Sequence, residues 1–311
     1  MIHSGPGYFD LSHYSLLQIS GPDAFGFLHA QITGDLNQLK LHGWLFSAWC
    51  QPNGRVICTF IIFARDDNLY LILPSMLKDT VMRRLSMYIL RSKVTLQDVT
   101  DDYVLMGLAG TDIEKILMQT VTQVPPVTGN MIQSEYFSCL KLWDKTPRYI
   151  LINTIEHVEG LLDNITTSFH SGKRSGWSLL DIEAGIPWII NSTSESFLPQ
   201  MLNIDQMHGL SYQKGCYPGQ EIIARLHYRG QLKKKMYLGS GNADFTPGAG
   251  DRLIHQDSGA VAGDVIDAEL HPAGGFRMLA VVETQSAESN NLCLEGATNI
   301  SIKLQHITYP A

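Results

Sequence analysis

The sequence predicts an α+β protein that ends in a small β-barrel or sandwich, and two observations lead to this class. Up to about Gly230, short apolar runs bounded by turn residues alternate with apolar stripes at helical spacing. Beyond about Gln231, only short β-like runs remain, and turns rich in Gly and Pro separate them. A chain of 311 residues with 44% hydrophobic and 17% charged residues can bury more than one core, which excludes a disordered protein. We therefore expect two related α+β regions, residues 1–110 and 111–230, followed by a β region at 231–311.

The first region is predicted to combine an antiparallel meander with two helices. The turn at Pro52-Asn-Gly54 has a physical basis, because proline presets φ and Asn or Gly accepts a positive φ. Leu77, Val81 and Leu85 recur on one helical stripe further along the chain. The expected elements are a strand at Tyr14–Ile19, a helix capped by Ser20 that reaches Gln31, strands at Trp44–Cys50, Arg55–Ala64 and Leu69–Leu73, and a helix at Ser75–Arg91.

The same alternation returns more loosely in the second region. Thr111 and Glu114 form the S/T-x-x-E pattern of a capping box, which predicts the start of a helix. Strands expected at Lys93–Gln97 and Tyr103–Ala109 end the first region. The other elements expected in the second region are strands at Tyr136–Trp143 and Arg148–Ile152 and a helix at Ile155–His170. The strands expected in the C-terminal region are Met236–Gly239, Arg252–His255, Val261–Ala268, Phe276–Glu283 and Ile300–Gln305.

Composition and motifs exclude several function classes. The longest apolar run, Val56–Ala64, is too short for a membrane-spanning helix, and the N-terminus lacks the basic start and apolar core of a secretory signal. The net charge of −7 argues against coating of nucleic acid by bulk attraction. The five cysteines form no C-x-x-C pair, so spacing encodes no zinc or iron–sulfur site, and scattered thiols favour a reducing cytoplasm. No P-loop, G-x-S-x-G, H-E-x-x-H or G-x-G-x-x-G motif is present.

One stretch, YQKGCYPGQEIIAR, surrounds a single thiol with glycines. Gly215 permits a tight turn, and Pro218 suits the first position of a helix predicted at Gly219–His227. Cys216 would then lie just before a helix N-terminus, where unpaired N–H groups and the helix dipole favour a thiolate. We therefore predict a lowered pKa for Cys216. The residues alone also allow a small buried cysteine in a turn that the glycines merely shape.

Positive charge is concentrated around this thiol. Lys214 and Arg225 would add to it directly, and Glu221 could simply pair with Arg225 on the helix surface. No acidic residue occurs from Ile222 to Ala243, a stretch that contains Arg225, Arg229, Lys233, Lys234 and Lys235. The lysine run is consistent either with a binding patch or with a solvated strand edge.

A second informative stretch is WSLLDIEAGIP, from Trp177 to Pro187. Glu183 precedes a glycine and a chain reversal. A carboxylate in a largely apolar cleft can accept two parallel hydrogen bonds from an amino-pyrimidine, and Trp177 could stack on a planar heterocycle. The alternative is a glutamate on a helix surface and a tryptophan in the core.

The chain resembles the YgfZ family of folate-binding, iron–sulfur-cluster-associated proteins, within the superfamily of the glycine-cleavage T-protein, an aminomethyltransferase. The most specific match, KGCYPGQE at Lys214–Glu221, resembles the family signature K-G-C-Y-x-G-Q-E. Leu180–Pro187 corresponds to the pterin-contacting stretch of the superfamily. Other matching blocks are Ser20–Ala24, Gln31–Thr33, Pro52–Arg55 and Ser92–Thr95. The resemblance covers nearly the whole chain and is weakest over 111–170 and after about residue 240.

This resemblance implies a T-protein-like architecture, with two interlocked ferredoxin-like α+β units around a central channel and a C-terminal β-barrel. It implies that tetrahydrofolate, or another reduced folate, binds in the channel near the signature thiol, Cys216. The residues that it marks as companions of this thiol are Lys214, Gln220, Glu221 and Arg225. The residues that it marks for folate are Glu183, which would contact the pterin, and the aromatic residues Trp177, Tyr14 and Tyr217.

One departure from the T-proteins bears on activity. Those enzymes carry an acidic pair in the strand after the meander turn, where a carboxylate assists aminomethyl transfer, whereas this chain has Cys58 and Thr59 there. A thiol and a hydroxyl cannot replace that carboxylate as a base of matched pKa. We therefore expect a cytoplasmic folate-binding accessory protein rather than a classical enzyme. It would support synthesis or repair of iron–sulfur clusters, with radical enzymes that thiolate tRNA as clients.

The role of the thiol stays open, as do two other hypotheses. One thiol cannot hold a [4Fe–4S] cluster, so Cys216 would lend a transient ligand, react with a sulfur or one-carbon intermediate, or form a mixed disulfide with a client. The competing enzyme hypothesis is a folate-dependent transferase or demethylase of the T-protein type. The third hypothesis, direct contact with tRNA, is suggested only by the basic stretch.

Overall fold

The computed structural model describes residues 7–120, 124–158, 163, 165, 167, 169–289 and 291–309. The chain forms two compact units. Unit 1 comprises Met1–Ala30, Asp35–Phe46 and Phe60–Trp177, and unit 2 comprises Gln31–Gly34, Ser47–Thr59 and Ser178–Ala311.

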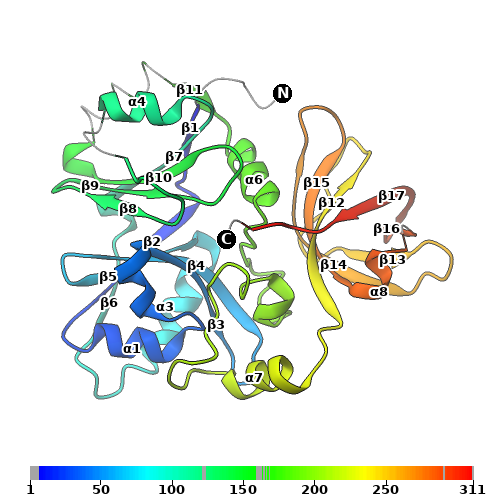
Figure 1. The fold of residues 1–311 in the computed structure, drawn as a ribbon, viewed down its shortest axis with the longest axis horizontal. Coiled ribbons are helices and arrows are strands. Elements are labelled where there is room, and N and C mark those ends of the chain that lie inside the picture. The colour runs from blue at the N-terminus through cyan, green and yellow to red at the C-terminus, as the bar shows by residue number, and fades with distance from the viewer. Residues whose placement is uncertain are drawn as a thin grey trace. The chain divides into compact units, whose positions relative to one another are not determined.

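Unit 1 contains a six-stranded sheet in the order β11-β1-β7-β10-β9-β8 (Figure 1). Its strands are β1 (Gly7–Asp10), β7 (Tyr103–Ala109), β8 (Met131–Gln133), β9 (Phe137–Lys141), β10 (Arg148–Thr154) and β11 (His170–Gly172). Strand β1 pairs antiparallel with β7 and parallel with β11, so the sheet combines strands from both predicted α+β regions. Ile113 and Leu117 of helix α4 (Ile113–Thr120) share a buried core with Tyr149 of β10.

A second sheet has five strands in the order β3-β4-β5-β2-β6. Its strands are β2 (Tyr14–Ser20), β3 (Trp44–Cys50), β4 (Val56–Arg65), β5 (Asn68–Pro74) and β6 (Thr95–Asp98). All residues of β3 are buried, as is typical of an apolar strand covered on both faces. Strands β3 and β4 contribute residues to both units. The helical elements of this part are α1 (Ala24–Gln31), η1 (Leu36–Gln38), α2 (Leu39–His42), η2 (Ser75–Leu77), α3 (Lys78–Ser86) and η3 (Thr100–Asp102).

Unit 2 ends in a closed barrel with the strand order β12-β15-β14-β13-β16-β17, yellow to red in Figure 1. The strands are β12 (Lys234–Gly241), β13 (Arg252–His255), β14 (Val261–Leu270), β15 (Phe276–Glu283), β16 (Leu292–Leu294) and β17 (Ala297–Gln305). Phe276, Met278 and Ala280 recur with a period of two and fill the barrel core. The other helical elements are η4 (Ile155–His157), α6 (Arg174–Glu183), η5 (Pro199–Leu202), α7 (Gln220–Arg229) and α8 (Thr284–Ala287).

The α+β class and the C-terminal barrel are confirmed, and three local expectations need correction. The helix predicted at Ser75–Arg91 opens as the 3-10 turn η2, and α3 ends at Ser86, before Leu90 takes a φ of 40° that a right-handed helix cannot include. The carboxylate of Glu114 accepts hydrogen bonds from Lys141 (2.6 Å) and Tyr149 (2.7 Å), so it binds the sheet rather than closing a capping box.

The helix predicted at Ile155–His170 opens as the 3-10 turn η4, and much of its remainder lies outside the described residues. The short strands β1, β8, β11 and β16 escape prediction because three or four residues show no clear periodicity.

His13, between β1 and β2, predicts how the folding stability of the protein depends on acidic pH. Burial, followed by the positive charge of Arg174, lowers the pKa of His13 from 6.5 to about 4. Between these values the unfolded chain binds the proton more readily than the folded protein does, so folding stability falls as the pH drops from 6.5 to about 4. We expect His13→Gln to lose less stability than the wild type over this window, measured by urea unfolding. An equal loss in both proteins would contradict the assignment.

Candidate functional site

The chain from Tyr212 to Gly219, the Cys216 loop, leads into helix α7 in unit 2. All five cysteines belong to the described residues, and Cys216 alone is exposed. Gly219 caps α7 with a left-handed φ of 82°. The helix therefore begins one residue later than predicted, and Pro218 lies in the preceding turn rather than at the first helical position.

Lys214 anchors the Cys216 loop to another segment of unit 2. Its Nζ donates hydrogen bonds to the carbonyl oxygens of Ile32 (2.8 Å) and Gly34 (2.9 Å). It also lies 5.2 Å from the ring centroid of Tyr217. Because hydrogen bonds from an ammonium are stronger than neutral ones, the side chain expected to add charge beside the thiol serves as an anchor for its loop.

Three hydrogen bonds between residues that are close in sequence hold the loop in its shape. The Tyr217 hydroxyl donates to the carbonyl oxygen of Ser211 (3.2 Å), and Nε2 of Gln220 donates to that of Lys214 (3.3 Å). The Ser211 hydroxyl oxygen accepts from the backbone N–H of Lys214 (3.3 Å). Burial raises the pKa of Tyr217. Tyr217 and Gln220 thus shape the loop that presents Cys216, and a contact of Tyr217 with folate stays a prediction.

A pair of buried hydroxyls holds the base of the loop. Thr33 Oγ1 donates to the carbonyl oxygen of Gly209 (2.7 Å) and lies 3.2 Å from Ser47 Oγ. Ser47 Oγ accepts from the backbone N–H of Gly34 (2.9 Å), and the backbone N–H of Ser211 donates to the Thr33 carbonyl (2.9 Å). Sequence reasoning assigned no role to Thr33 or Ser47. The only signal was the matching block that ends at Thr33.

The loop also meets the turn between β3 and β4 at very close range. A Cβ added to Gly219 would lie 2.5 Å from the Cα of Gly54 and 2.7 Å from the carbonyl oxygen of Gln51. Gly54 itself has a φ of 81°, and its N–H donates to the Gln51 carbonyl (2.8 Å). The Pro-Asn-Gly turn and the signature glycine, distant in sequence, are therefore packed backbone against backbone.

Basic and aromatic side chains emerge from α7. Glu221 and Arg225 are exposed, and no ion pair joins them in the described structure. The ring of Tyr212 stacks on His227 with centroids 3.8 Å apart, and His227 lies 4.8 Å from Tyr228, which is 67% exposed.

The lysine run that follows α7 does not form one patch. Lys233 is exposed, whereas Lys234 and Lys235 are half-buried. Nζ of Lys234 lies 3.9 Å from Asp264.

Glu183 ends helix α6, and its surroundings come from the barrel. Its Oε1 lies 3.6 Å from Nε2 of His271 and 4.0 Å from Nε of Arg277, and the Glu183 side chain is 31% exposed. No described residue donates a hydrogen bond to Oε2. The helix is anchored by buried Leu180 and Ile182, so a partly exposed carboxylate projects from an otherwise apolar stretch. No hydrogen bond from a described residue occupies either carboxylate oxygen, so both remain available to a ligand.

The two other aromatic candidates belong to unit 1. The ring of Trp177 is 1% exposed, its centroid lies 5.6 Å from that of Phe9, and it blocks the space beside Gly107. Trp177 and Glu183 are six residues apart on α6, so their side chains leave the helix about 120° apart. Tyr14 is 4% exposed on β2, and its ring packs at a tilt against His13, with centroids 4.2 Å apart. That Trp177 and Tyr14 line a folate pocket stays a prediction.

Cys58 and Thr59, which the sequence comparison set against the acidic pair expected in T-proteins, have structural surroundings. Cys58 is fully buried, and burial raises the pKa of its thiol. Thr59 Oγ1 donates to the carbonyl oxygen of Pro187 (2.8 Å) and accepts from the N–H of Ile189 (3.0 Å). Thr59 thus fixes the chain just after the reversal that follows Glu183, and neither side chain offers a base.

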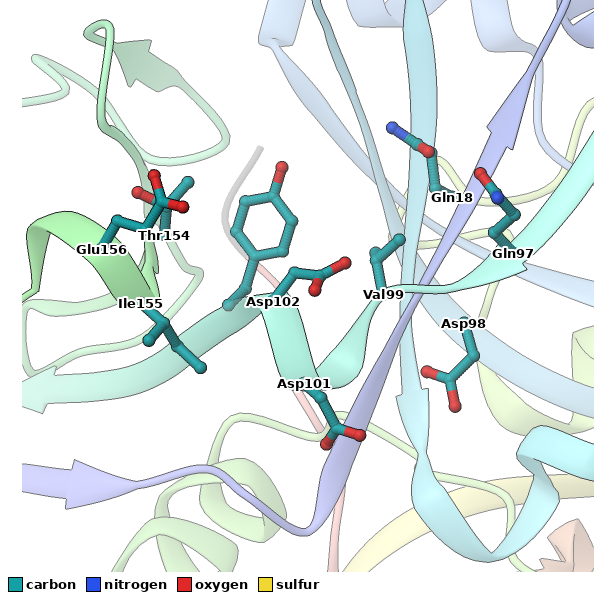
Figure 2. Close-up of a pocket in the computed structure, with 10 residues that line it drawn as sticks. Gln18, Gln97, Asp98, Val99, Asp101, Asp102, Thr154, Ile155 and Glu156 are labelled. Atoms are coloured by element: carbon teal, nitrogen blue, oxygen red, sulfur yellow. The ribbon is translucent and has the colours of Figure 1, made fainter.

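Unit 1 also contains an acidic pocket of about 540 Å³ that sequence reasoning missed. Figure 2 shows Thr154, Ile155 and Glu156 on one side of it and Gln18, Gln97 and Val99 on the other. Asp98, Asp101 and Asp102 complete the acidic lining. Asp98 is paired with Lys78 at 2.5 Å. None of the predicted site residues lines this pocket.

Neither a cluster of metal ligands nor a membrane-spanning helix is present in the part of the chain that the structure describes. No group of three or more His, Cys, Asp or Glu side chains there is arranged to hold a metal ion. Likewise, none of its helices has the length and apolarity needed to cross a bilayer.

Comparison with known proteins places these residues in a family context. Residues 1–134 match the family described as GCVT N-terminal domain. The tRNA-modifying protein YgfZ of Pectobacterium carotovorum subsp. carotovorum is 29% identical over 306 residues, which cover 98% of this chain and 92% of that protein. The tRNA-modifying protein YgfZ of Yersinia enterocolitica is 28% identical over 301 residues, which cover 96% of this chain and 91% of that protein.

The fold has a match among solved structures. The glycine cleavage system aminomethyltransferase T from Bartonella henselae superposes with a TM-score of 0.81 over 97% of this chain and 85% of that chain, at 14% sequence identity. The T-protein-like fold expected from the motifs is therefore confirmed. The chain is similar along almost its whole length to tRNA-modifying YgfZ proteins, and it has the fold of aminomethyltransferase T.

Proposed function

We propose that the protein binds a reduced folate, with tetrahydrofolate as the expected form, and acts as an accessory factor in the synthesis or repair of iron–sulfur clusters. Its clients would be radical enzymes that modify tRNA. The similarity of the chain to tRNA-modifying proteins supports the choice of these clients. The proposed setting is the cytoplasm, where five unpaired thiols suit the reducing conditions.

The observation that carries the proposal is the presentation of Cys216. The other four cysteines are buried, and burial raises the pKa of Cys139, for example, to about 12. Cys216 alone is exposed. Its loop is fixed by the hydrogen bonds of Lys214 and by the close packing of Gly219 against Gly54. A fixed and accessible thiol can serve as a transient cluster ligand, accept sulfur or a one-carbon group, or form a mixed disulfide with a client. These three roles stay alternatives.

The residues around Glu183 fit a pterin. A reduced folate presents an amino group and a ring N–H side by side, and a carboxylate can accept both. Glu183 offers an Oε2 to which no described residue donates a hydrogen bond, and its Oε1 lies near the side chains of His271 and Arg277. Bound folate would supply one-carbon chemistry, and the chain would bind and orient the ring.

Aminomethyl transfer of the T-protein type is the alternative. Against it stand the buried thiol of Cys58 and the hydrogen-bonded hydroxyl of Thr59, which leave no base where the transferase needs one. Incubation with tetrahydrofolate and an aminomethyl or methylamine donor, followed by an assay for methylene-tetrahydrofolate, distinguishes the two. Sustained turnover would favour the transferase.

Replacing the Glu183 carboxylate tests folate binding. Glu183→Gln keeps the shape but removes the charge that strengthens both hydrogen bonds. We expect tetrahydrofolate to bind about 30-fold more weakly, a loss of roughly 2 kcal/mol, by isothermal titration calorimetry. Glu295→Gln, an exposed carboxylate on the barrel, is the matched control and should bind as the wild type does. No binding heat with the wild-type protein would refute the proposed cofactor.

Replacing the thiol tests the chemical role of the loop. Cys216→Ser should unfold like the wild type, because the side chain is exposed, yet fail to support tRNA thiolation in cells that lack the endogenous protein. Thiolated nucleosides are measured by mass spectrometry of bulk tRNA. Gln213→Ala, at another exposed position of the same loop, is the control. Full complementation by Cys216→Ser would show that the thiol has no chemical role.

Direct contact with tRNA is a second candidate for the partner, and the observation in its favour is the exposed face of α7. Arg225, Arg229 and the exposed ring of Tyr228 combine positive charge with a stacking surface. Such binding would weaken steeply with salt. Anisotropy titrations of labelled tRNA across a salt series test it, and salt-independent or undetectable binding would exclude it.

A further inference from the structure

We infer that the β14–β15 hairpin and the C-terminal segment of the barrel are positioning elements of the folate site, acting through Glu183. The inference rests on the proposed function, since it assumes that Glu183 contacts the pterin. All the residues involved belong to unit 2, and the supporting residues His271, Arg277 and Tyr309 lie outside the family motifs.

The turn of the hairpin sets the tautomer of His271. Its backbone N–H donates to the carbonyl oxygen of Gly275 (2.8 Å), and its Nδ1 accepts from the N–H of Ala273 (3.2 Å). A ring nitrogen that accepts carries no proton, so the proton of the neutral ring resides on Nε2. Nε2 is the atom that lies 3.6 Å from Oε1 of Glu183. The turn therefore directs an N–H towards the carboxylate.

Arg277, on the next strand, supplies a permanent charge to the same oxygen. Its neighbours Phe276 and Met278 point into the barrel core and fix the strand, so Arg277 projects outwards. Its Nε lies 4.0 Å from Oε1 of Glu183. Because Nε2 of His271 and the guanidinium of Arg277 both approach Oε1, they favour one rotation of the carboxylate and leave Oε2 free of protein donors among the described residues.

The C-terminal segment holds the backbone that follows Glu183. After β17 the chain runs back towards the end of α6 (Figure 1), where the Tyr309 hydroxyl donates to the carbonyl oxygen of Gly185 (2.9 Å). Ile307 packs so closely on Gly185 that a Cβ there would lie 2.5 Å from its Cγ2. Burial raises the pKa of Tyr309, which keeps its hydroxyl protonated as a donor.

The carboxylate is therefore held at two points, by the hairpin at the side chain and by the C-terminal segment at the backbone. A binding site needs its ligand-contacting groups placed to within fractions of an ångström. It therefore loses affinity when the residues that hold those groups are removed, even if every group that touches the ligand remains. Arg277 and Tyr309 are positioning residues in this sense. They would not touch the folate themselves.

A double-mutant cycle tests the coupling. We would measure tetrahydrofolate binding by calorimetry for wild type, Arg277→Gln, Glu183→Gln and the double variant, with Arg252→Gln, an exposed arginine on β13, as the matched control. Arg277→Gln should weaken binding about fivefold. The same substitution should have no effect in the Glu183→Gln background, because a positioning residue acts only through the group that it positions.

Tyr309→Phe gives an independent readout, since it removes one hydrogen bond and keeps the ring. We expect weaker binding of tetrahydrofolate than in the wild type, because the backbone after Glu183 loses this anchor. The inference is wrong if Arg277→Gln binds tetrahydrofolate as tightly as the wild type does. It is also wrong if Arg277→Gln still lowers affinity fivefold in the Glu183→Gln background. Neither result would contradict folate binding itself. If neither the wild type nor Arg252→Gln binds tetrahydrofolate, the proposed function itself fails.

Discussion

Gly219→Ala is expected to destabilise the protein by about 3 kcal/mol or more, because it combines two separate penalties. Gly219 has a φ of 82°, where a Cβ clashes with the local backbone. The added methyl would also lie 2.5 Å from the Cα of Gly54 and 2.7 Å from the carbonyl of Gln51, which are backbone atoms that cannot rotate away. Thermal unfolding followed by circular dichroism should show a melting temperature lower by roughly 5–10 °C.

Gly215 provides the matched control within the same loop. A Cβ there would meet no atom within 4 Å, and Gly215 has no positive φ. Gly215→Ala should therefore change the free energy of unfolding by less than about 0.5 kcal/mol. Equal effects of the two substitutions would show that the close approach of the two turns contributes little to stability.

Lys214→Met should loosen the Cys216 loop more than it unfolds the protein. The substitution keeps most of the aliphatic stem but leaves the carbonyls of Ile32 and Gly34 without the ammonium, at a cost of about 3 kcal/mol for two charged hydrogen bonds. We expect faster amide exchange over residues 211–219 and a changed rate of Cys216 modification by a thiol reagent.

Lys233→Met is the control for this change, since Lys233 is exposed just beyond α7. It removes the same charge without removing an anchor, so exchange in the Cys216 loop should match the wild type. If both variants behave alike, net charge rather than the two carbonyl contacts governs the loop. Lys214→Arg should restore only part of the protection, because a planar guanidinium cannot reproduce the geometry of a point donor.

The sequence predicted the architecture well because long periodic runs dominate it. Strand β3 and the turn at Gly54 follow from apolar runs around Pro-Asn-Gly, and the barrel follows from short runs spaced by turns. The prediction failed where a few residues decide the outcome. Leu90 ends the helical run after α3 with a φ of 40°, and no glycine or proline at this position signals the change in the sequence.

For the site, the sequence located the Cys216 loop but not the way it is held. From the motif, Lys214 was predicted to place positive charge near the thiol. In the structure its ammonium instead donates hydrogen bonds to the carbonyl oxygens of Ile32 and Gly34, which are far away in sequence. Such backbone acceptors leave no trace in residue type, so no pattern could identify them. The same holds for His271 and Arg277, which lie near Glu183 only because the barrel folds back onto α6.

The anchors of the Cys216 loop have a consequence for the order of events during synthesis. The bond from Thr33 to Gly209 spans 176 residues, and the bond from Lys214 to Ile32 spans 182. Contacts of such long range form late, because the intervening chain must first be translated and then closed into a loop. A nascent chain on the ribosome therefore carries its first segment, with Thr33, long before the partner emerges. The thiol-bearing loop takes its final shape only when more than half of the polypeptide has left the exit tunnel.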